Sequence, residues 1–176
     1  TYQFNVISLH DLLNEGNEEF LVSLSSVSGA NVNSAGDAEG LVEIVDDDGA
    51  PQISVLAASV TEAGTLDFVV SLSSVSGMNV TFDYRTYDGS ALSADYSQLS
   101  LTPVTLSAGL VAITIPVVST HDLLNENNET FTLSISSIAN ANGLVEWNTG
   151  TIVDDDNEPF IYISDSSVTE GQTHAF

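Results

Sequence analysis

Apolar and polar residues alternate with a period of two along most of the chain. Such alternation is typical of β-strands that bury one face, because successive side chains of a strand point to opposite sides. It is clearest in TLDFVVSLS (65–73), VAITIPVV (111–118) and ETFTLSI (129–135). The residues predicted to share a buried face within each strand are Leu66, Phe68, Val70 and Leu72; Val111, Ile113, Ile115 and Val117; and Phe131, Leu133 and Ile135.

The alternation and the turn residues between the runs predict seven short strands. Turn signals such as SGMN (76–79) and SAGL (107–110) fall between them, and helical periodicity lasts nowhere for more than a turn. Short strands at this spacing are typical of an all-β protein built as a β-sandwich. The predicted strands lie near 52–56, 65–73, 79–87, 99–106, 110–118, 129–138 and 145–153.

The chain also repeats itself, which indicates tandem units. HDLLNEGNEEFLVSLSS (10–26) matches HDLLNENNETFTLSISS (121–137) at 12 of 17 positions, and IVDDDGAPQISVLAASVTE (44–62) matches IVDDDNEPFIYISDSSVTE (152–170) at 11 of 19. The unit is therefore about 110 residues long. We predict that 1–48 is the C-terminal part of a preceding repeat, 49–156 a complete repeat, and 157–176 the start of a following one.

Charge restricts the partners. The 176 residues include 25 acidic side chains and one basic side chain, Arg85, which gives a formal net charge of −24. Nothing in such a chain could neutralise phosphates, so nucleic acid is excluded and anionic lipid is disfavoured. Repulsion on this scale favours the binding of cations. Cysteine is absent, and no apolar run is long enough to span a membrane. With no signal peptide at Thr1, we expect an excerpt or a processed product.

The carboxylates gather between predicted strands, where the loops of a sandwich meet. Converging carboxylates without a cationic neighbour suit Ca²⁺, which takes 6–8 oxygen ligands. Zinc is disfavoured, because cysteine is absent and only three histidines are present. The acidic residues of the complete unit that could converge are Glu62, Asp88, Asp95, Asp122, Glu126, Glu129, Asp154, Asp155 and Asp156.

Four segments together resemble the signatures of the Calx-β domain family: SVTEAGTLDFVVSLSSVSG (59–77), VTFDYRTYDGSALSADY (80–96), HDLLNENNETFTLSIS (121–136) and GTIVDDD (150–156). The resemblance spans 51–156, with partial copies on either side. It implies an immunoglobulin-like antiparallel sandwich that holds calcium in loops at one end. The family also occurs in many bacterial surface proteins.

The resemblance further implies a ligand set, carried over residue by residue. In the complete repeat these residues are Glu62, Asp95, Asp122, Glu126, Glu129, Asp154, Asp155 and Asp156. In the partial repeats the corresponding acidic residues are Asp11, Glu15, Glu18, Asp46, Asp47, Asp48 and Glu170. The acidic loop departs from the family's denser run, since His121, Asn125 and Asn127 dilute it. We therefore expect one or two ions.

Several simpler interpretations stay open. The aspartate triplet could be a solvated strand end, and Asp88 in DGSA a plain turn residue. We predict no functional role for His10, His121 and His174. No nucleophile stands in a recognisable setting, and the acidic pairs lack a flanking aromatic cleft, so we expect no enzyme. Two tripeptides fit the N-glycosylation acceptor pattern, at Asn79 and Asn128.

The sequence thus predicts a calcium-binding structural repeat of an extracellular or cell-surface protein, such as an adhesin or a filament, in which calcium stiffens the repeat junctions. The expected partners are neighbouring repeats and, through strand pairing, identical chains. The alternative is a calcium-sensing or ligand-binding regulatory module.

Overall fold

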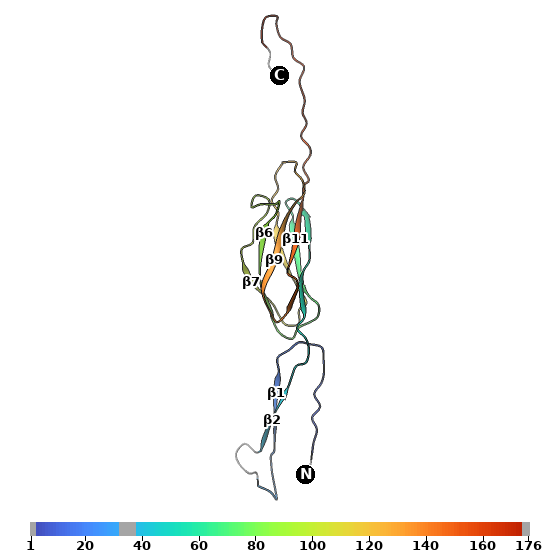
Figure 1. Cartoon of the computed structure of the whole chain (residues 1–176), viewed down its shortest axis with the longest axis vertical. Helices are drawn as coiled ribbons and strands as arrows, with labels where there is room; N and C mark the ends of the chain where they lie inside the picture. The colour runs from blue at the N-terminus through green and yellow to red at the C-terminus, as the bar shows by residue number, and fades with distance from the viewer. Residues whose placement is uncertain (1–2, 32–37, 174–176) are drawn as a thin grey trace.

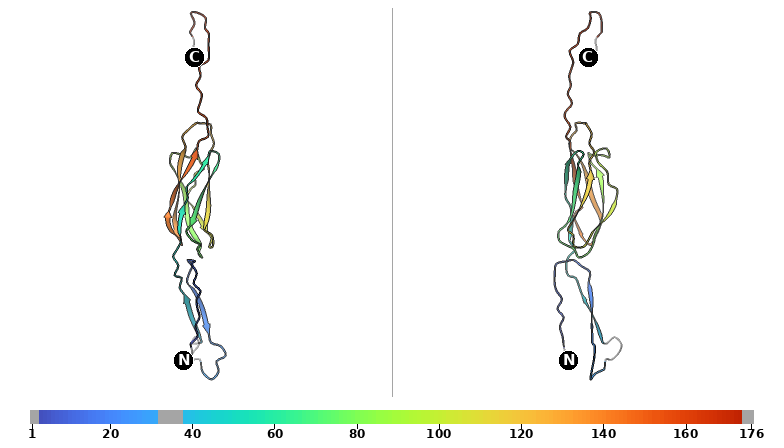
Figure 2. Two further views of the ribbon diagram at one scale, coloured as in Figure 1. Left: turned by 90° about the vertical axis from the view of Figure 1, so that its right-hand side faces the viewer. Right: turned by 180° about the vertical axis from the view of Figure 1, so that it is seen from behind.

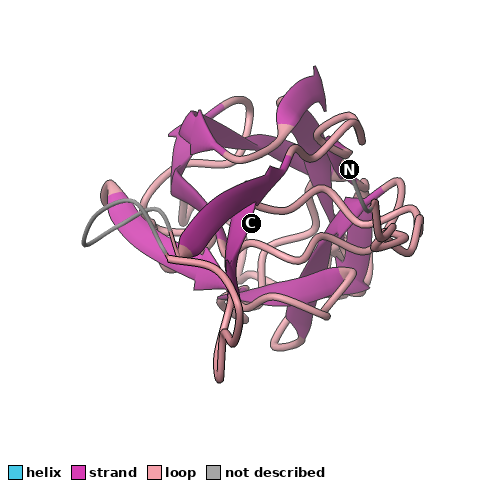
Figure 3. Cartoon of the chain, turned by 90° about the horizontal axis from the view of Figure 1, so that it is seen from below, coloured by secondary structure: helices cyan, strands magenta, loops and turns pink. Residues whose placement is uncertain are grey.

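The computed structural model describes residues 3–31 and 38–173, and every regular element in them is a β-strand (Figure 3). None of these residues is helical, in agreement with the lack of helical periodicity in the sequence. No helix in this part of the chain could cross a membrane. The strands are β1 (Glu18–Ser23), β2 (Glu39–Ile44), β3 (Gln52–Val55), β4 (Ala58–Thr61), β5 (Thr65–Leu72), β6 (Val80–Asp88), β7 (Thr102–Leu106), β8 (Ala112–Val118), β9 (Glu129–Ala139), β10 (Asn142–Val145) and β11 (Trp147–Val153).

Strands β3 to β11 form the predicted sandwich, which confirms the all-β fold class. One sheet has four strands in the order β10-β3-β5-β8, and the other has five in the order β4-β11-β9-β6-β7. Most neighbours are antiparallel, but β10 pairs with β3, and β11 with β4, in parallel. The first and last strands of the unit therefore each divide between the two sheets.

The pattern did not reveal these two divisions. Strand β4 was not predicted, and β10 was missed, because all but its last residue lie in the gap between the predicted strands 129–138 and 145–153. All four residues of β10 are exposed, so they carry no apolar alternation. Strand β4 lies at a sheet edge and buries no residue fully. Edge strands of this kind owe their position to backbone pairing rather than to burial, which explains the difference.

The core lies between the two sheets, as the alternating faces predicted. The rings of Phe68 and Phe131 pack edge to face with centroids 5.8 Å apart, and Tyr96 stacks on Phe131 at 4.0 Å. Gly150 is required beside them, because a Cβ there would lie 2.7 Å from both phenylalanine rings. Val111 is the exception among the predicted core positions: it is 45% exposed, since it precedes the first residue of β8.

The loops of the sandwich gather at two opposite ends, called here the upper and lower poles as in Figure 1. The chain leaves β11 at the upper pole and continues as an extended segment. The β1–β2 pair lies below the lower pole (Figures 1 and 2). Its register, from Glu18 opposite Ile44 to Ser23 opposite Glu39, repeats that of β9 and β11, where Glu129 lies opposite Ile152.

Candidate functional site

The upper pole carries an acidic site assembled from four separate loops. Glu62 stands in the β4–β5 turn, Asp95 in the β6–β7 loop, and the aspartate triplet directly after β11. The β8–β9 loop and the first residue of β9, Glu129, supply the remaining residues. This C-terminal acidic site is defined by Glu62, Asp95, His121, Asp122, Asn125, Glu126, Glu129, Asp154, Asp155 and Asp156.

Backbone pairing brings the first and last of these loops together. Strands β4 and β11 run parallel, with Thr61 opposite Val153, so both strands end at the same pole. The Glu62 amide donates a hydrogen bond to the Val153 carbonyl at 3.1 Å. The turn after it is tied to the β8–β9 loop, because the Ser119 amide donates to the Gly64 carbonyl at 2.9 Å. The sheet topology therefore fixes Glu62 beside the aspartates.

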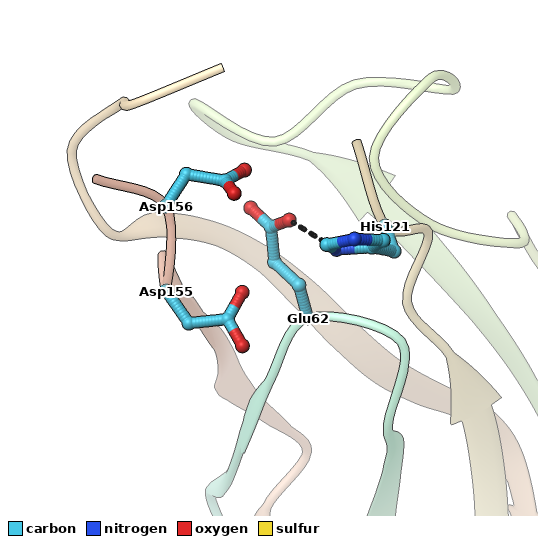
Figure 4. A group of neighbouring side chains, drawn as sticks. All are labelled: Glu62, His121, Asp155 and Asp156. Carbon is cyan, nitrogen blue, oxygen red and sulfur yellow. Dashed lines mark ion pairs between the residues drawn. The ribbon is translucent and has the colours of Figure 1, made fainter. Parts of the chain in front are cut away.

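Glu62 is the centre of the tightest group (Figure 4). Its carboxylate points between Asp155 and Asp156 on one side and His121 on the other. One potential ligand atom from each of these four residues lies within 4.8 Å of the others. The Glu62 side chain is only 10% exposed, and its Oε2 lies 3.5 Å from His121 Nδ1 and 3.4 Å from the Asp122 amide. A largely buried carboxylate with so few donors favours a bound cation.

Asn125 fastens the triplet to the β8–β9 loop. Its Nδ2 donates to Asp154 Oδ2 at 3.4 Å and to the Asp156 carbonyl at 3.0 Å. The remaining oxygens Asp154 Oδ1 and Asp156 Oδ2 are buried and have no hydrogen-bond partner. Buried anionic oxygens without donors are costly, and a hard divalent cation is the partner that carboxylate oxygens suit best. The residues present therefore fit a calcium ion.

The other acidic side chains crowd the same space. Partial burial, followed by the charge of Asp95 and hydrogen bonding with it, raises the pKa of Glu129 to about 7. Loss of hydration, and then the charges of Asp122 and Asp95, raise the pKa of Glu126. Asp95 itself is held by the Leu92 amide, which donates to its Oδ2 at 2.7 Å. These raised pKa values of the two carboxyl groups therefore reflect loss of hydration first and the repulsion of neighbouring carboxylates second.

A second acidic site lies where the loop before β1 meets the connection between β2 and β3, at the point where the partial repeat joins the sandwich. This junction acidic site is defined by His10, Asp11, Asn14, Glu15, Glu18, Asp46, Asp47 and Asp48. Asn14 repeats the bonds of Asn125, since its Nδ2 donates to Asp46 Oδ2 at 3.5 Å and to the Asp48 carbonyl at 3.0 Å. His10 Nδ1 lies 3.7 Å from Asp47 Oδ1. Loss of hydration and the surrounding carboxylates, Asp11 first, raise the pKa of Glu15.

The structure thus brings together all predicted ligand residues of the complete repeat and six of the seven from the partial repeats. Glu170 lies apart from them, on an exposed turn of the C-terminal segment. Asp88 serves the fold, because it accepts hydrogen bonds from the Tyr96 hydroxyl at 2.7 Å and from Gln98 at 2.5 Å. Burial, and then this bond, raise the pKa of Tyr96 to about 12.

Sequence reasoning missed two kinds of residue at these sites. His10 and His121 were given no role but lie beside carboxylates. Asn125 was treated only as dilution of the acidic loop, and Asn14 was not considered. The sequence did contain one sign that these residues matter: HDLLNE occurs without change at 10–15 and at 121–126. His174 falls outside the described residues. Asn79 and Asn128 are both exposed, and their glycosylation stays a prediction.

Comparison with known proteins identifies the family. The Calx-beta domain family matches residues 1–48 and 46–156, so the chain belongs to it. Among solved structures, the chain is similar to the apo-form Calx CBD1 domain, with a TM-score of 0.56 and 18% identity over 61% of this chain and 100% of that one. No curated protein matches the sequence.

Two further structures show the same fold. The calcium binding domain CBD12 of CALX1.1 gives a TM-score of 0.55 and 19% identity over 65% of this chain and 50% of that one. The Calx CBD2 domain gives 0.51 and 11% over 57% and 85%. The chain therefore has the sandwich of the Calx calcium-binding domains, together with carboxylate clusters that could hold a metal ion.

Proposed function

We propose that this chain is a calcium-binding structural repeat of an extracellular surface protein, in which calcium stiffens the junctions between repeats. The observation that carries the proposal is the pair of buried, unpartnered oxygens Asp154 Oδ1 and Asp156 Oδ2 beside Glu62. They lie where the chain passes from one repeat toward the next. Membership of the Calx-beta family, whose domains are regulatory calcium-binding modules rather than enzymes, supports the choice of ion.

The residues that would hold the ion come from every loop of the upper pole. Glu62, Asp154 and Asp156 would form the inner part of the ligand set, since the Glu62 side chain is largely buried and Asp154 Oδ1 and Asp156 Oδ2 are buried without hydrogen-bond donors. A bound calcium ion would supply the positive charge that lets these oxygens coexist. Neutralising them would also tie the exit of β11 to the β4–β5 turn, which would restrict the angle at which the chain leaves the sandwich.

The same logic would apply at the junction acidic site. Its aspartate triplet, Asp46 to Asp48, lies in the short connection between β2 and β3, so an ion there would connect two successive repeats. An array of such links would be stiff with calcium and flexible without it. A stiff extracellular array is the property that an adhesin stalk or a surface filament needs, and its partners would be the neighbouring repeats.

The test is calorimetric titration of the whole chain with Ca²⁺, with and without Asp154→Asn combined with Asp156→Asn. We expect the variant to lose the tightest binding event. The matched control is Asp67→Asn combined with Glu146→Gln, which removes the same charge from exposed positions away from the poles. Equal calcium binding by the wild type and by the Asp154/Asp156 variant would refute the site.

The alternative is a sensing module, and it is favoured by the likeness to the Calx calcium-binding domains. The two functions differ in affinity. A structural link in an extracellular setting would stay occupied at millimolar calcium, with a Kd of about 10⁻⁴–10⁻³ M, whereas a sensor binds at about 10⁻⁷–10⁻⁵ M. The Kd from the same titration therefore distinguishes them.

A further inference from the structure

The loop that carries the junction acidic site also touches the sandwich that follows it. The Gly77 amide donates to the Asn14 carbonyl at 3.0 Å, and Asn14 forms a parallel bridge with Ser76. The Glu15 side chain covers Gly77, because a Cβ built on this glycine would lie 2.5 Å from Glu15 Cγ. Residues 74–79, the β5–β6 turn of the lower pole, thus receive the Asn-Glu pair of the preceding repeat. We call them the serine–glycine turn.

The serine–glycine turn is held in shape by its own sandwich. Ser76 is 1% exposed, its Oγ accepts a hydrogen bond from the Met78 amide at 3.1 Å, and its carbonyl accepts one from the Gly109 amide at 2.9 Å. The turn contains no charged residue. An uncharged, prearranged turn can approach an acidic loop without electrostatic repulsion, and its bare glycine leaves room for the glutamate side chain.

At the upper pole, the same Asn-Glu pair is left uncovered by the residues that the structure describes. Asn14 and Glu15 are half-buried against the serine–glycine turn, whereas their counterparts Asn125 and Glu126 are exposed. The internal bonds of the two loops agree, since each asparagine donates to its triplet carbonyl at 3.0 Å. The bonds from Leu13 to Asp11 and from Leu124 to Asp122 also agree, at 2.9 and 2.8 Å. The covered conformation therefore exists before any contact is made.

We propose that Asn125 and Glu126 form a docking surface for the serine–glycine turn of a following Calx-beta repeat. The partner is the lower pole of a sandwich of this fold, in which a glycine at the position of Gly77 offers its backbone amide. The extended segment after β11 supports this occupant. It leaves the same pole, and its sequence up to Glu170 repeats that of 44–62, which includes β3 and β4. The inference rests on the proposed tandem array, but it requires no metal ion for its geometry.

The test uses the whole chain with one more repeat added, made by joining residues 69–156 after Phe176, which corresponds to Phe68 in the 108-residue offset. The chain has no cysteine, so engineered pairs report without background. Glu126→Cys is combined with a cysteine in place of the added copy's counterpart of Gly77. Glu15→Cys with Gly77→Cys, at the contact already seen, is the positive control. The negative control places the second cysteine at the added copy's counterpart of Ser107, on the neighbouring turn.

We expect the Glu126 pair to form a disulfide as fast as the Glu15 pair and at least tenfold faster than the Ser107 control, since only close Cβ atoms can be bridged. A Glu126 pair that is no faster than the Ser107 control overturns the docking surface, provided the Glu15 pair forms. Calcium titration of the same extended chain without cysteines is read separately. If the chain binds calcium but the crosslink does not form, only the docking surface is refuted. If the crosslink forms but the chain does not bind calcium, only the proposed function is refuted.

Discussion

The two acidic sites of this chain contain copies of the same loop but differ in the residues that surround it. Both contain HDLLNE, an aspartate triplet, and an asparagine that bonds the triplet in the same way. Around the upper loop, the described residues add Glu62 and Asp95 from two other loops of the same sandwich. Around the lower loop, they add the serine–glycine turn of the next sandwich. The comparison teaches that this loop can have two kinds of neighbour: the other loops of its own pole, which add carboxylates, and the turn of an adjoining sandwich, which covers it.

The two copies of the β3 segment also differ in burial according to what lies beside them. Ile53 and Val55 of β3 are 0% and 1% exposed, whereas Ile161 and Ile163, their counterparts by the 108-residue offset, are 97% and 79% exposed. The two segments have similar apolar patterns, but only the first has a sheet to join. Burial is therefore set by the partner sheet and not by the strand sequence alone.

Calcium removal should produce the largest effect. In about 10 mM free Ca²⁺, which is 100 times a Kd of about 10⁻⁴ M, the bound ion adds about 2.7 kcal/mol to the free energy of unfolding. For a unit of this size, the melting temperature should fall by about 10–20 °C when calcium is replaced by a chelator. Differential scanning calorimetry measures it. Combining Asp46→Asn with Asp48→Asn should leave most of the calcium effect on the sandwich intact, whereas combining Asp154→Asn with Asp156→Asn should abolish it.

Filling the glycine of the serine–glycine turn should loosen the contact between the two repeats. Gly77→Ala would place a Cβ 2.5 Å from Glu15 Cγ, so the Glu15 side chain must move aside, and because this side chain is flexible the cost should lie below the roughly 1–3 kcal/mol of overpacking in a closed core. Hydrogen exchange at residues 10–17 should then accelerate while the sandwich core stays protected. Glu15→Ala in the same chain removes the obstructing atoms and should restore protection. A loss of protection that Glu15→Ala does not reverse would point to the turn itself and contradict the contact.

Removing the asparagine should affect the two sites unequally. Asn125→Ala frees Asp154 and the Asp156 carbonyl from their donor, and loss of such bonds costs about 1–2 kcal/mol. The metal-free sandwich should therefore melt a few degrees lower, as circular dichroism would show. Asn14→Ala should leave that transition nearly unchanged but loosen the junction, which hydrogen exchange detects. Equal effects of both variants on the sandwich would contradict the separation of the two sites.

The smallest effect should be a pH dependence that reverses with calcium. The folded-state pKa of Glu129 is raised from 4.5 to about 7, so the native state binds more protons than the unfolded state between these values. In chelator, stability should therefore rise as the pH falls from 8 toward 5. With calcium, protons compete with the ion and the trend should invert. Glu129→Gln should flatten the metal-free profile, and a metal-free protein that loses stability on mild acidification would contradict the assignment.

Much of the fold was predictable because burial leaves a period-two trace. The alternating positions Phe68, Val70, Phe131 and Leu133 are all fully buried, as expected. Strands β4 and β10 escaped prediction because edge pairing needs no apolar face. At the candidate site, the clustered carboxylates were predictable from the charge of the loops and from their repetition in the sequence. The roles of His121 and Asn125 did not, since neutral side chains within an acidic loop give no sign of which oxygens they face.

The sequence by itself determined the all-β sandwich, the repeat of about 110 residues, and the acidic character of the loops, because each depends on local periodicity, self-similarity or composition. Only the tertiary structure decided which carboxylates meet, which of their oxygens are left without donors, and that one acidic loop is covered while its copy is exposed. These properties depend on parallel pairing of β4 with β11 and on contact between repeats. Both join residues far apart in the chain, and no local pattern encodes such distances.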